Sequence, residues 1–144
     1  MNMTTKECLD KGLLRKIESN IKRAKSSIET AEERVEHAEE LFNAKFYEDS
    51  IISSYTSMFH SSRALLFKDG YEERSHFALC IYISEQYNLV IENRFITELN
   101  SLRLARHDLI YGLEKSKEIQ ESEAEDIIGT AKEYLEIIKK LIKI

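Results

Sequence analysis

The clearest pattern in this chain is a run of apolar residues that recur in alternating steps of three and four positions. The run extends from Leu14 to Phe42 without a break, and lysine, arginine and glutamate fill many of the positions between. Such spacing places every apolar side chain on one stripe of a helix. An extended coiled coil has the same stripe, but further amphipathic segments downstream favour a long helix in an antiparallel bundle. We expect this helix to end at Asn43-Ala44-Lys45.

A second segment, roughly residues 47–68, is apolar or small on all sides. Between Ser50 and Ser62 it contains no aspartate, glutamate, lysine or arginine, and serines separate its large apolar residues. Helices of this kind lie in the centre of a domain. Serine side chains permit close contact between helices and can donate hydrogen bonds to carbonyls one turn back. We therefore expect a buried central helix that stops at Asp69-Gly70.

The remaining segments predict shorter helices with recognisable start signals. Thr4 and Glu7 have the spacing of a capping box, which favours a short helix over about residues 5–11. Ser75 and Asn93 are suitable residues to begin a third and a fourth bundle helix. After a polar loop over residues 114–122, Ser122 is expected to cap a last helix with apolar residues again in steps of three and four.

Composition favours helices over a β-rich fold. The 144 residues include no proline and only four glycines, whereas sandwiches and barrels need those residues in their many turns. The length fits one domain with a core of its own. The sequence thus predicts a single all-α domain over residues 1–144, with a short N-terminal helix and an up-and-down bundle of four to five helices over about residues 13–143.

Charge and cysteine content limit the partners and the compartment. The net charge of −5 means that the surface as a whole does not attract phosphate backbones, so nucleic-acid binding needs a local basic patch. No apolar run is long enough to span a bilayer, and the N-terminus lacks the apolar stretch of a signal peptide. Cys8 and Cys80 form no ligand pattern and are expected to be free thiols. These features predict a cytoplasmic protein without membrane contact.

The fourth helix carries the one chemically unusual position. Its apolar stripe runs from Phe95 to Leu113 and is interrupted by Arg106, which stands between Leu102 and Leu109. A guanidinium on an apolar stripe is costly unless a carboxylate, a polar groove or a phosphate receives it. Arg106 is therefore a candidate for ligand binding.

Polar side chains cluster around this arginine. Arg103, His107 and Tyr111 are spaced by four residues and share a helix face beside Arg106, and Asp108 lies next to them. Arginine forks bind phosphate, and imidazole and phenol groups transfer protons, so the cluster suits a phosphate-bearing ligand. Two other interpretations stay open here: a solvated helix face, and an arginine that pairs with a glutamate or marks a subunit interface.

Metal and cofactor chemistry is not indicated. His76 and Cys80 are four residues apart and could both contact a metal, but two ligands do not make a zinc site, so a core position is favoured. His60 is expected to be a buried histidine of the central helix. The chain has no glycine-rich phosphate loop and no metalloprotease motif. The sequence predicts no cofactor and no metal site.

Three stretches of the chain carry a family resemblance: DSIISSYTSMFHSSRALLFKDGYEERSH over residues 49–76, RHDLIY over 106–111 and TAKEYLEIIKKLI over 130–142. They resemble the small stand-alone HEPN domains of bacteria and archaea, and the likeness covers roughly residues 17–142. The resemblance implies an up-and-down helical bundle that forms a homodimer. In catalytic members the arginine-bearing helices of two protomers form a metal-independent ribonuclease site. Many members are encoded beside a minimal nucleotidyltransferase, as toxin and antitoxin.

The motif of the active family members is an arginine, a polar residue, three variable residues and a histidine. The resemblance implies that Arg106 is the arginine and His107 the polar residue, whereas Tyr111 stands at the histidine position. Tyrosine, with an ordinary pKa of about 10, is a poor general base at neutral pH. Either His107 takes over proton transfer, or the chain is not a ribonuclease of the usual kind.

Two functions are therefore open from the sequence. In the first, the chain engages RNA or a nucleotide at Arg106, as an endoribonuclease of a toxin–antitoxin-like or nucleotidyltransferase-partnered system. In the second, it is a non-catalytic dimerisation and interaction module in which Arg106 organises the interface. An exposed Tyr111 would also be a candidate target for modification by a nucleotidyltransferase.

Overall fold

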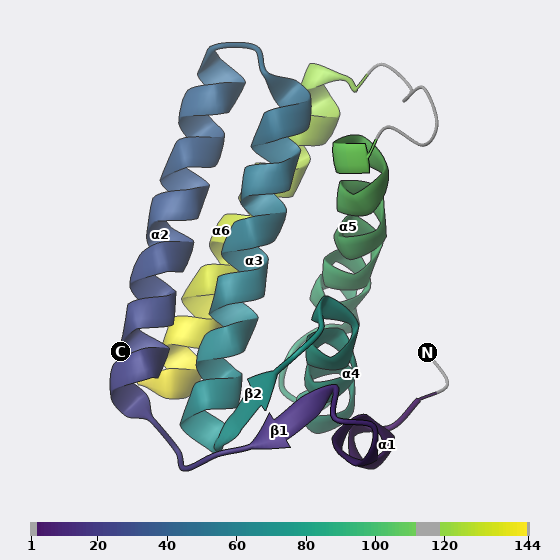
Figure 1. Ribbon diagram of the computed structural model, residues 1–144. Helices are drawn as coiled ribbons and strands as arrows, with labels where there is room; N and C mark the ends of the chain where they lie inside the picture. The colour runs from purple at the N-terminus through teal and green to yellow at the C-terminus, as the bar shows by residue number, and fades with distance from the viewer. Residues whose placement is uncertain (1–2, 112–118, 144) are drawn as a thin grey trace.

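Helices dominate the chain, which a computed structural model describes over residues 3–111 and 119–143. Within these residues the elements are α1 (Thr5–Asp10), β1 (Leu14–Lys16), α2 (Ile21–Asn43), α3 (Tyr47–Asp69), β2 (Tyr71–Glu73), α4 (His76–Gln86), α5 (Asn93–Tyr111) and α6 (Glu121–Ile142). The four long helices alternate in direction, and the two short strands lie at the lower end of the bundle (Figure 1). The predicted all-α bundle is confirmed.

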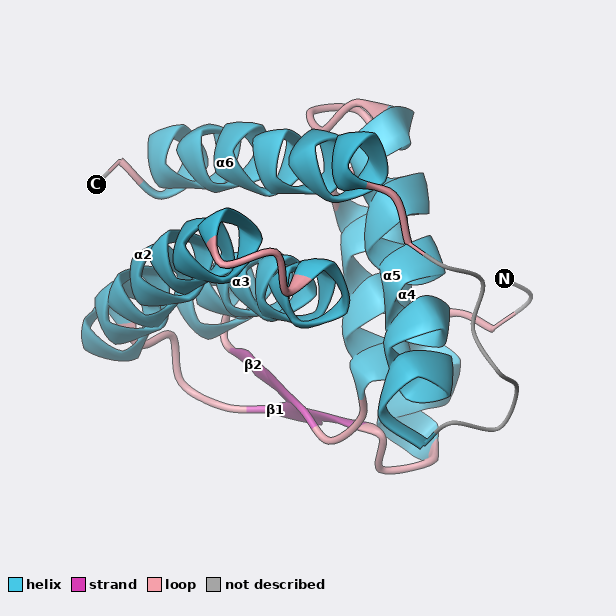
Figure 2. Cartoon of the chain, turned by 90° about the horizontal axis from the view of Figure 1, so that it is seen from above, coloured by secondary structure: helices cyan, strands magenta, loops and turns pink. Residues whose placement is uncertain are grey.

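The central helix is α3, as its composition predicts. It packs against α2, α5 and α6, and in the view from above it lies between α2 and the α4–α5 pair (Figure 2). Hydroxyl groups join it to α2: the Oγ atoms of Ser53 and Ser57 donate to the carbonyls of Arg34 and Ala31 at 2.7 and 2.8 Å. Ser27 of α2 donates in the other direction, to the carbonyl of His60 at 2.9 Å. These three serines thus satisfy their hydroxyls while letting the two helices approach closely.

The first long helix begins later than its apolar stripe predicts. Leu14 lies in β1, which pairs antiparallel with β2 in the register Leu14 with Glu73. The helix starts only at Ile21, after Asn20, whose side chain accepts a hydrogen bond from the backbone N–H of Arg23 at 3.0 Å. An apolar stripe reports which side chains turn inward but not which backbone carries them. The bundle therefore starts near residue 21 rather than 13.

The turn that ends α3 requires a glycine. Gly70 has φ of +92°, in the left-handed region, and its N–H donates to the carbonyl of Leu66 at 2.9 Å. A Cβ at this position would stand 2.9 Å from the carbonyl oxygen of Ile17. This close approach lets β2 turn back beside β1, since the N–H of Ile17 donates to the carbonyl of Gly70 at 2.9 Å.

We expect Gly70→Ala to lower the free energy of unfolding by about 2–4 kcal/mol, because left-handed strain and a backbone clash add together. Gly12→Ala is the matched control, since Gly12 has φ of +72° but no atom within 4 Å of the added Cβ. It should cost only about 1 kcal/mol. Urea unfolding measures both free energies, provided that the m-value is the same in the variants and the wild type. Equal losses at the two positions would contradict the role of the clash.

Besides the start of α2, one further predicted helix boundary is wrong, and the others are confirmed. The side chains of Thr4 and Ser75 cap α1 and α4, and α5 begins at Asn93. The last helix begins at Glu121 after Gln120, which makes no side-chain cap hydrogen bond, so Ser122 is not its cap. Most of the predicted loop before it lies outside the described residues. Its predicted inward residues are all buried: Ile128, Ala131, Leu135, Ile138 and Ile142.

Two further expectations concern membranes and thiols. None of the helices in the described part of the chain combines the length and the apolar character needed to cross a bilayer. Cys8 and Cys80 are both free, as predicted, and both are buried.

Candidate functional site

Arg106 lies where the apolar stripe of α5 leaves the core. The buried part of the stripe consists of Phe95, Ile96, Leu99 and Leu102. One turn later Arg106 is half-buried, and its guanidinium carbon lies 6.0 Å from the centroid of the Tyr55 ring on α3. Leu109 is also only half-buried, and Leu113 lies outside the described residues. The arginine thus lies at the edge of the core and not on a buried stripe. From this position its side chain can reach a ligand.

A cavity of about 540 Å³ opens beside this arginine. The start of α4 supplies His76 and Phe77 to its wall, and α5 supplies the rest, namely Arg103, Leu104, Arg106, His107 and Asp108. Four of the five residues predicted from the sequence therefore line one cavity. Tyr111 is not among its described lining residues. Its side chain is 64% exposed, and its ring lies 4.7 Å from that of His107, centroid to centroid.

The two arginines of the cavity form no ion pair with any carboxylate that the structure describes. Arg103 donates to Oδ1 of Asn100 at 3.0 and 3.3 Å, and its guanidinium carbon lies 5.4 Å from the centroid of the Phe77 ring. Among the described residues, no carboxylate lies within ion-pair distance of Arg103 or Arg106. Within the described chain their positive charges are not paired, so this cavity is a candidate site for an anion.

His76, for which the sequence favoured a core position, is half-buried and lines the cavity, a role that sequence reasoning missed. Its Nδ1 shares a 2.7 Å hydrogen bond with the hydroxyl of Tyr55, and its ring stacks on Phe59 at 4.1 Å between centroids. In the part of the chain that the structure describes, no group is hydrogen-bonded to Nε2. The ring is therefore held through one nitrogen while the other remains available.

The charge state of His76 follows from its surroundings. Burial, Arg106 and Arg103 all lower the pKa of His76 below its ordinary value, so the imidazole is neutral at neutral pH. In the tautomer whose Nδ1–H donates to the Tyr55 oxygen, Nε2 carries a lone pair and can accept a proton. A neutral histidine beside two arginines is suited to general base chemistry on a phosphate ester.

Metal binding receives no support from this arrangement. Within residues 3–111 and 119–143 there is no group of three or more histidine, cysteine, aspartate or glutamate residues that could hold a metal ion. Cys80 is 1% exposed, and burial raises the pKa of its thiol to about 11. The core position favoured for Cys80 is therefore observed. His60 is half-buried at the surface of α3 rather than enclosed in the core, contrary to expectation.

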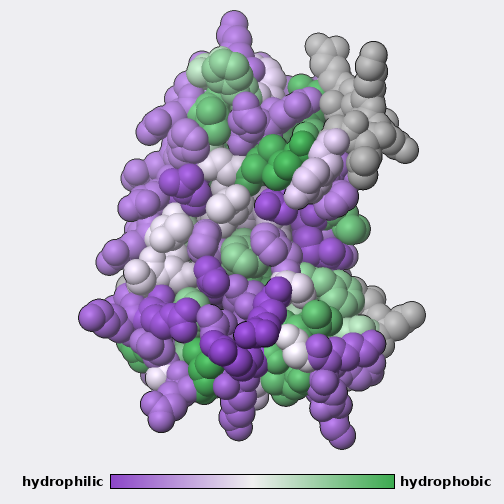
Figure 3. All heavy atoms as spheres, viewed as in Figure 1, coloured by the Kyte–Doolittle hydropathy of each residue, from purple (hydrophilic) through white to green (hydrophobic). Residues whose placement is uncertain are grey.

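The outer face of α5 is partly apolar. Leu104 and Ile110 are 53% and 46% exposed, and Tyr111 lies on the same terminal stretch of the helix. On the face where α2, α3 and α5 are seen together, apolar groups emerge between polar side chains (Figure 3). Exposed apolar residues beside a charged cavity are typical of a surface that contacts a partner.

The sequence matches a protein-family model and is similar to an archaeal protein. The family model of the HEPN domain matches residues 24–141, a range that includes α3 to α5 and the whole cavity. A Methanocaldococcus jannaschii protein named "Putative toxin MJ0605" is 33% identical over 108 residues, which cover 72% of this chain and 76% of that protein.

Proposed function

Because the chain belongs to the HEPN domain family, we propose that it is a toxin-like protein that binds and cleaves RNA at the Arg106 cavity. One observation carries this proposal: two guanidiniums that have no carboxylate partner within residues 3–111 and 119–143 line the same cavity as two imidazoles. The guanidiniums supply the affinity for phosphate, and the imidazoles supply the proton transfers. The name of the archaeal relative supports the toxin-like role.

The chemistry requires no metal ion. The ribose 2′-hydroxyl gives its proton to Nε2 of His76, and the 2′-oxygen attacks the adjacent phosphorus. The bond from phosphorus to the 5′-oxygen then breaks, and that oxygen takes a proton from His107. Arg103 and Arg106 stabilise the negative charge that develops on the phosphoryl oxygens. The products are a 2′,3′-cyclic phosphate and a free 5′-hydroxyl.

In this proposal His76 supplies the base that a histidine at position 111 would provide. In this proposal Tyr111 takes no part in proton transfer, because its ring lies outside the described lining of the cavity. Asp108 lines the cavity without an ion pair among the described residues. It helps to orient the ligand.

The homodimer and the protein partner are further parts of the proposal. The exposed apolar side chains of Leu104 and Ile110 support an interface in which α5 helices of two copies meet. A minimal nucleotidyltransferase is the proposed antitoxin, and the 64% exposure of Tyr111 leaves its hydroxyl accessible to such an enzyme. We place the system in the cytoplasm, in keeping with the two free cysteines.

The test is incubation of purified protein with a mixed RNA substrate in the presence of EDTA. We expect cleavage by the wild type, and its loss in Arg106→Ala and His107→Ala variants. Without Arg106, RNA affinity should also fall by about tenfold or more, the effect of losing a charge-assisted hydrogen bond. Arg94→Ala is the matched control, since Arg94 lies on the same helix but forms surface ion pairs with Glu92 and Glu133.

Circular dichroism and sedimentation must accompany these assays. Unchanged RNA binding in a folded Arg106→Ala variant would refute the site. If the wild type binds no RNA and Arg106→Ala dissociates the dimer, the second candidate function is correct. In that case the chain is a non-catalytic interaction module, which the exposed apolar face of α5 also favours.

A further inference from the structure

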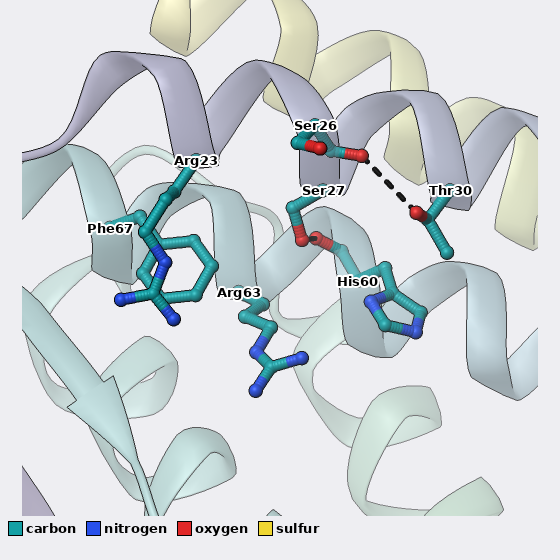
Figure 4. A pocket seen from close by; sticks show the side chains of 7 residues that line it. All are labelled: Arg23, Ser26, Ser27, Thr30, His60, Arg63 and Phe67. Atoms are coloured by element: carbon teal, nitrogen blue, oxygen red, sulfur yellow. Dashed lines mark hydrogen bonds between the residues drawn. The ribbon is translucent and has the colours of Figure 1, made fainter.

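A second cavity, of about 220 Å³, lies between α2 and α3. Arg23, Ser26 and Thr30 line it from α2, and His60, Arg63 and Phe67 line it from α3. Figure 4 shows the two guanidinium groups and the His60 ring extending to the same side of this helix pair, with Arg63 between Arg23 and His60. No sequence motif pointed to this cavity, because its two arginines stand 40 positions apart on separate helices.

Aromatic contacts hold the two arginines in place. The guanidinium carbon of Arg23 lies 4.1 Å from the centroid of the Phe67 ring, and that of Arg63 lies 5.4 Å from the same centroid. Arginines that stack on one ring lose less freedom when they bind a ligand, since their side chains are already ordered.

The ion pairs of Arg23 and Arg63 with acidic neighbours leave some guanidinium N–H donors unused. Nε of Arg63 lies 2.8 Å from Glu73, and Nη2 of Arg23 lies 3.3 Å from Glu72, which also pairs with Arg15. A guanidinium carries five N–H donors, so each arginine retains several for a ligand. Three arginines share two carboxylates here, and the cluster keeps a net positive charge.

Positive charge also surrounds the histidine of this cavity. Burial, followed by Arg63 and Arg34, lowers the pKa of His60 to about 4, so its ring is neutral at neutral pH. Nε of Arg34 is buried and has no hydrogen-bond partner among the described residues. The surroundings therefore favour an anion.

A single aromatic ring contacts a histidine of this cavity and a histidine of the Arg106 cavity. The centroid of Phe59 lies 5.4 Å from that of His60 and 4.1 Å from that of His76. The ring centroids of His60 and His76 can therefore be no farther apart than the sum of these two distances. Stacked nucleotides rise by about 3.4 Å each, so roughly three of them cover this separation. A strand of this length is therefore long enough to span the distance between the two histidines.

We propose that the Arg23–Arg63 cavity binds a backbone phosphate of the same RNA strand whose reacting phosphate occupies the Arg106 cavity. This inference rests on the proposed function and adds a substrate class to it: single-stranded RNA of several nucleotides rather than a mononucleotide or a dinucleotide. Phosphate contacts of this kind set the register of a strand without reading its bases. The second cavity thus determines how long a substrate must be.

Fluorescence anisotropy with labelled RNA of two lengths tests the proposal. The probes are a dinucleotide and an oligouridylate of about ten nucleotides, both 2′-O-methylated so that no cleavage occurs. We expect Arg23→Gln to weaken binding of the longer strand about fivefold and Ser26→Glu about tenfold. Arg23→Gln should also reduce the slope of log affinity against log salt concentration by about 0.7 in magnitude, the value for one phosphate of a single strand. Binding of the dinucleotide should not change in either variant.

Two matched controls belong to this experiment. Lys22→Gln removes the charge of the residue that precedes Arg23 and does not line the cavity, and Ser26→Gln adds bulk without charge. Each should change affinity less than about twofold. If Arg106-dependent binding is the same for both lengths and Arg23→Gln behaves like Lys22→Gln, the second cavity is refuted while the proposed function stands. If neither length binds, the proposed function fails, and this inference with it.

Discussion

We expect a His76→Gln variant to cleave RNA roughly 10²- to 10⁴-fold more slowly than the wild type, the contribution of a positioned general base. Its RNA affinity should stay within about twofold, since Arg103 and Arg106 remain in place. A fall in rate without a fall in affinity separates a proton-transfer role from a binding role. Single-turnover cleavage at saturating protein measures the first quantity, and anisotropy with a 2′-O-methylated strand measures the second.

His37→Gln is the matched control for this variant. His37 lies on α2 with a side chain that is 48% exposed, and it does not line the cavity. Its replacement should leave both rate and affinity unchanged. Wild-type cleavage by a folded His76→Gln variant would show that His107 acts alone, and that the Tyr55–His76 hydrogen bond has no role in the reaction.

The largest effect on stability is expected at Tyr134. This residue is fully buried, its ring lies 5.9 Å from that of Phe95, and its hydroxyl shares a 2.6 Å hydrogen bond with Ser62. We expect Tyr134→Ala to lower the free energy of unfolding by about 3–5 kcal/mol, because a large cavity would open between α3, α5 and α6. At this chain length the melting temperature should fall by roughly 10 °C or more.

Tyr134→Phe separates packing from hydrogen bonding. It removes only the hydroxyl, and Ser62 keeps its hydrogen bond to the carbonyl of Met58 at 2.9 Å. The loss should therefore be only about 1 kcal/mol. Urea unfolding curves measure both variants. A melting temperature within about two degrees of the wild type for Tyr134→Ala would contradict the central position assigned to this ring.

Sequence patterns predicted the helices because the information that specifies them is local. Apolar residues that recur in steps of three and four positions mark the inward face of α6. The cap at Ser75 depends on residues within one helical turn. The start of α2 could not be found in this way. It depends on β2, which returns beside Leu14 only because Gly70 adopts a left-handed conformation.

The candidate site was predictable only where it lies on one helix. Arg103, Arg106 and His107 share α5, so their spacing alone brought them together. His76 enters from α4 and is oriented by Tyr55 of α3, and no local pattern records a contact across 21 positions of the chain. The Arg23–Arg63 cavity is likewise built from two helices and depends on how they are aligned.

That alignment follows from the hydroxyl groups between α2 and α3. Apolar contacts are not directional and allow one helix to slide along another, whereas a hydrogen bond from serine to a carbonyl tolerates little displacement. Ser27, Ser53 and Ser57 form three such bonds at different heights along the pair. A slip of one residue would break all three at once. The serines therefore fix the axial register of α2 against α3, and this register places Arg23 and Arg63 in the same cavity. Within the described chain, neither arginine is hydrogen-bonded to these serines.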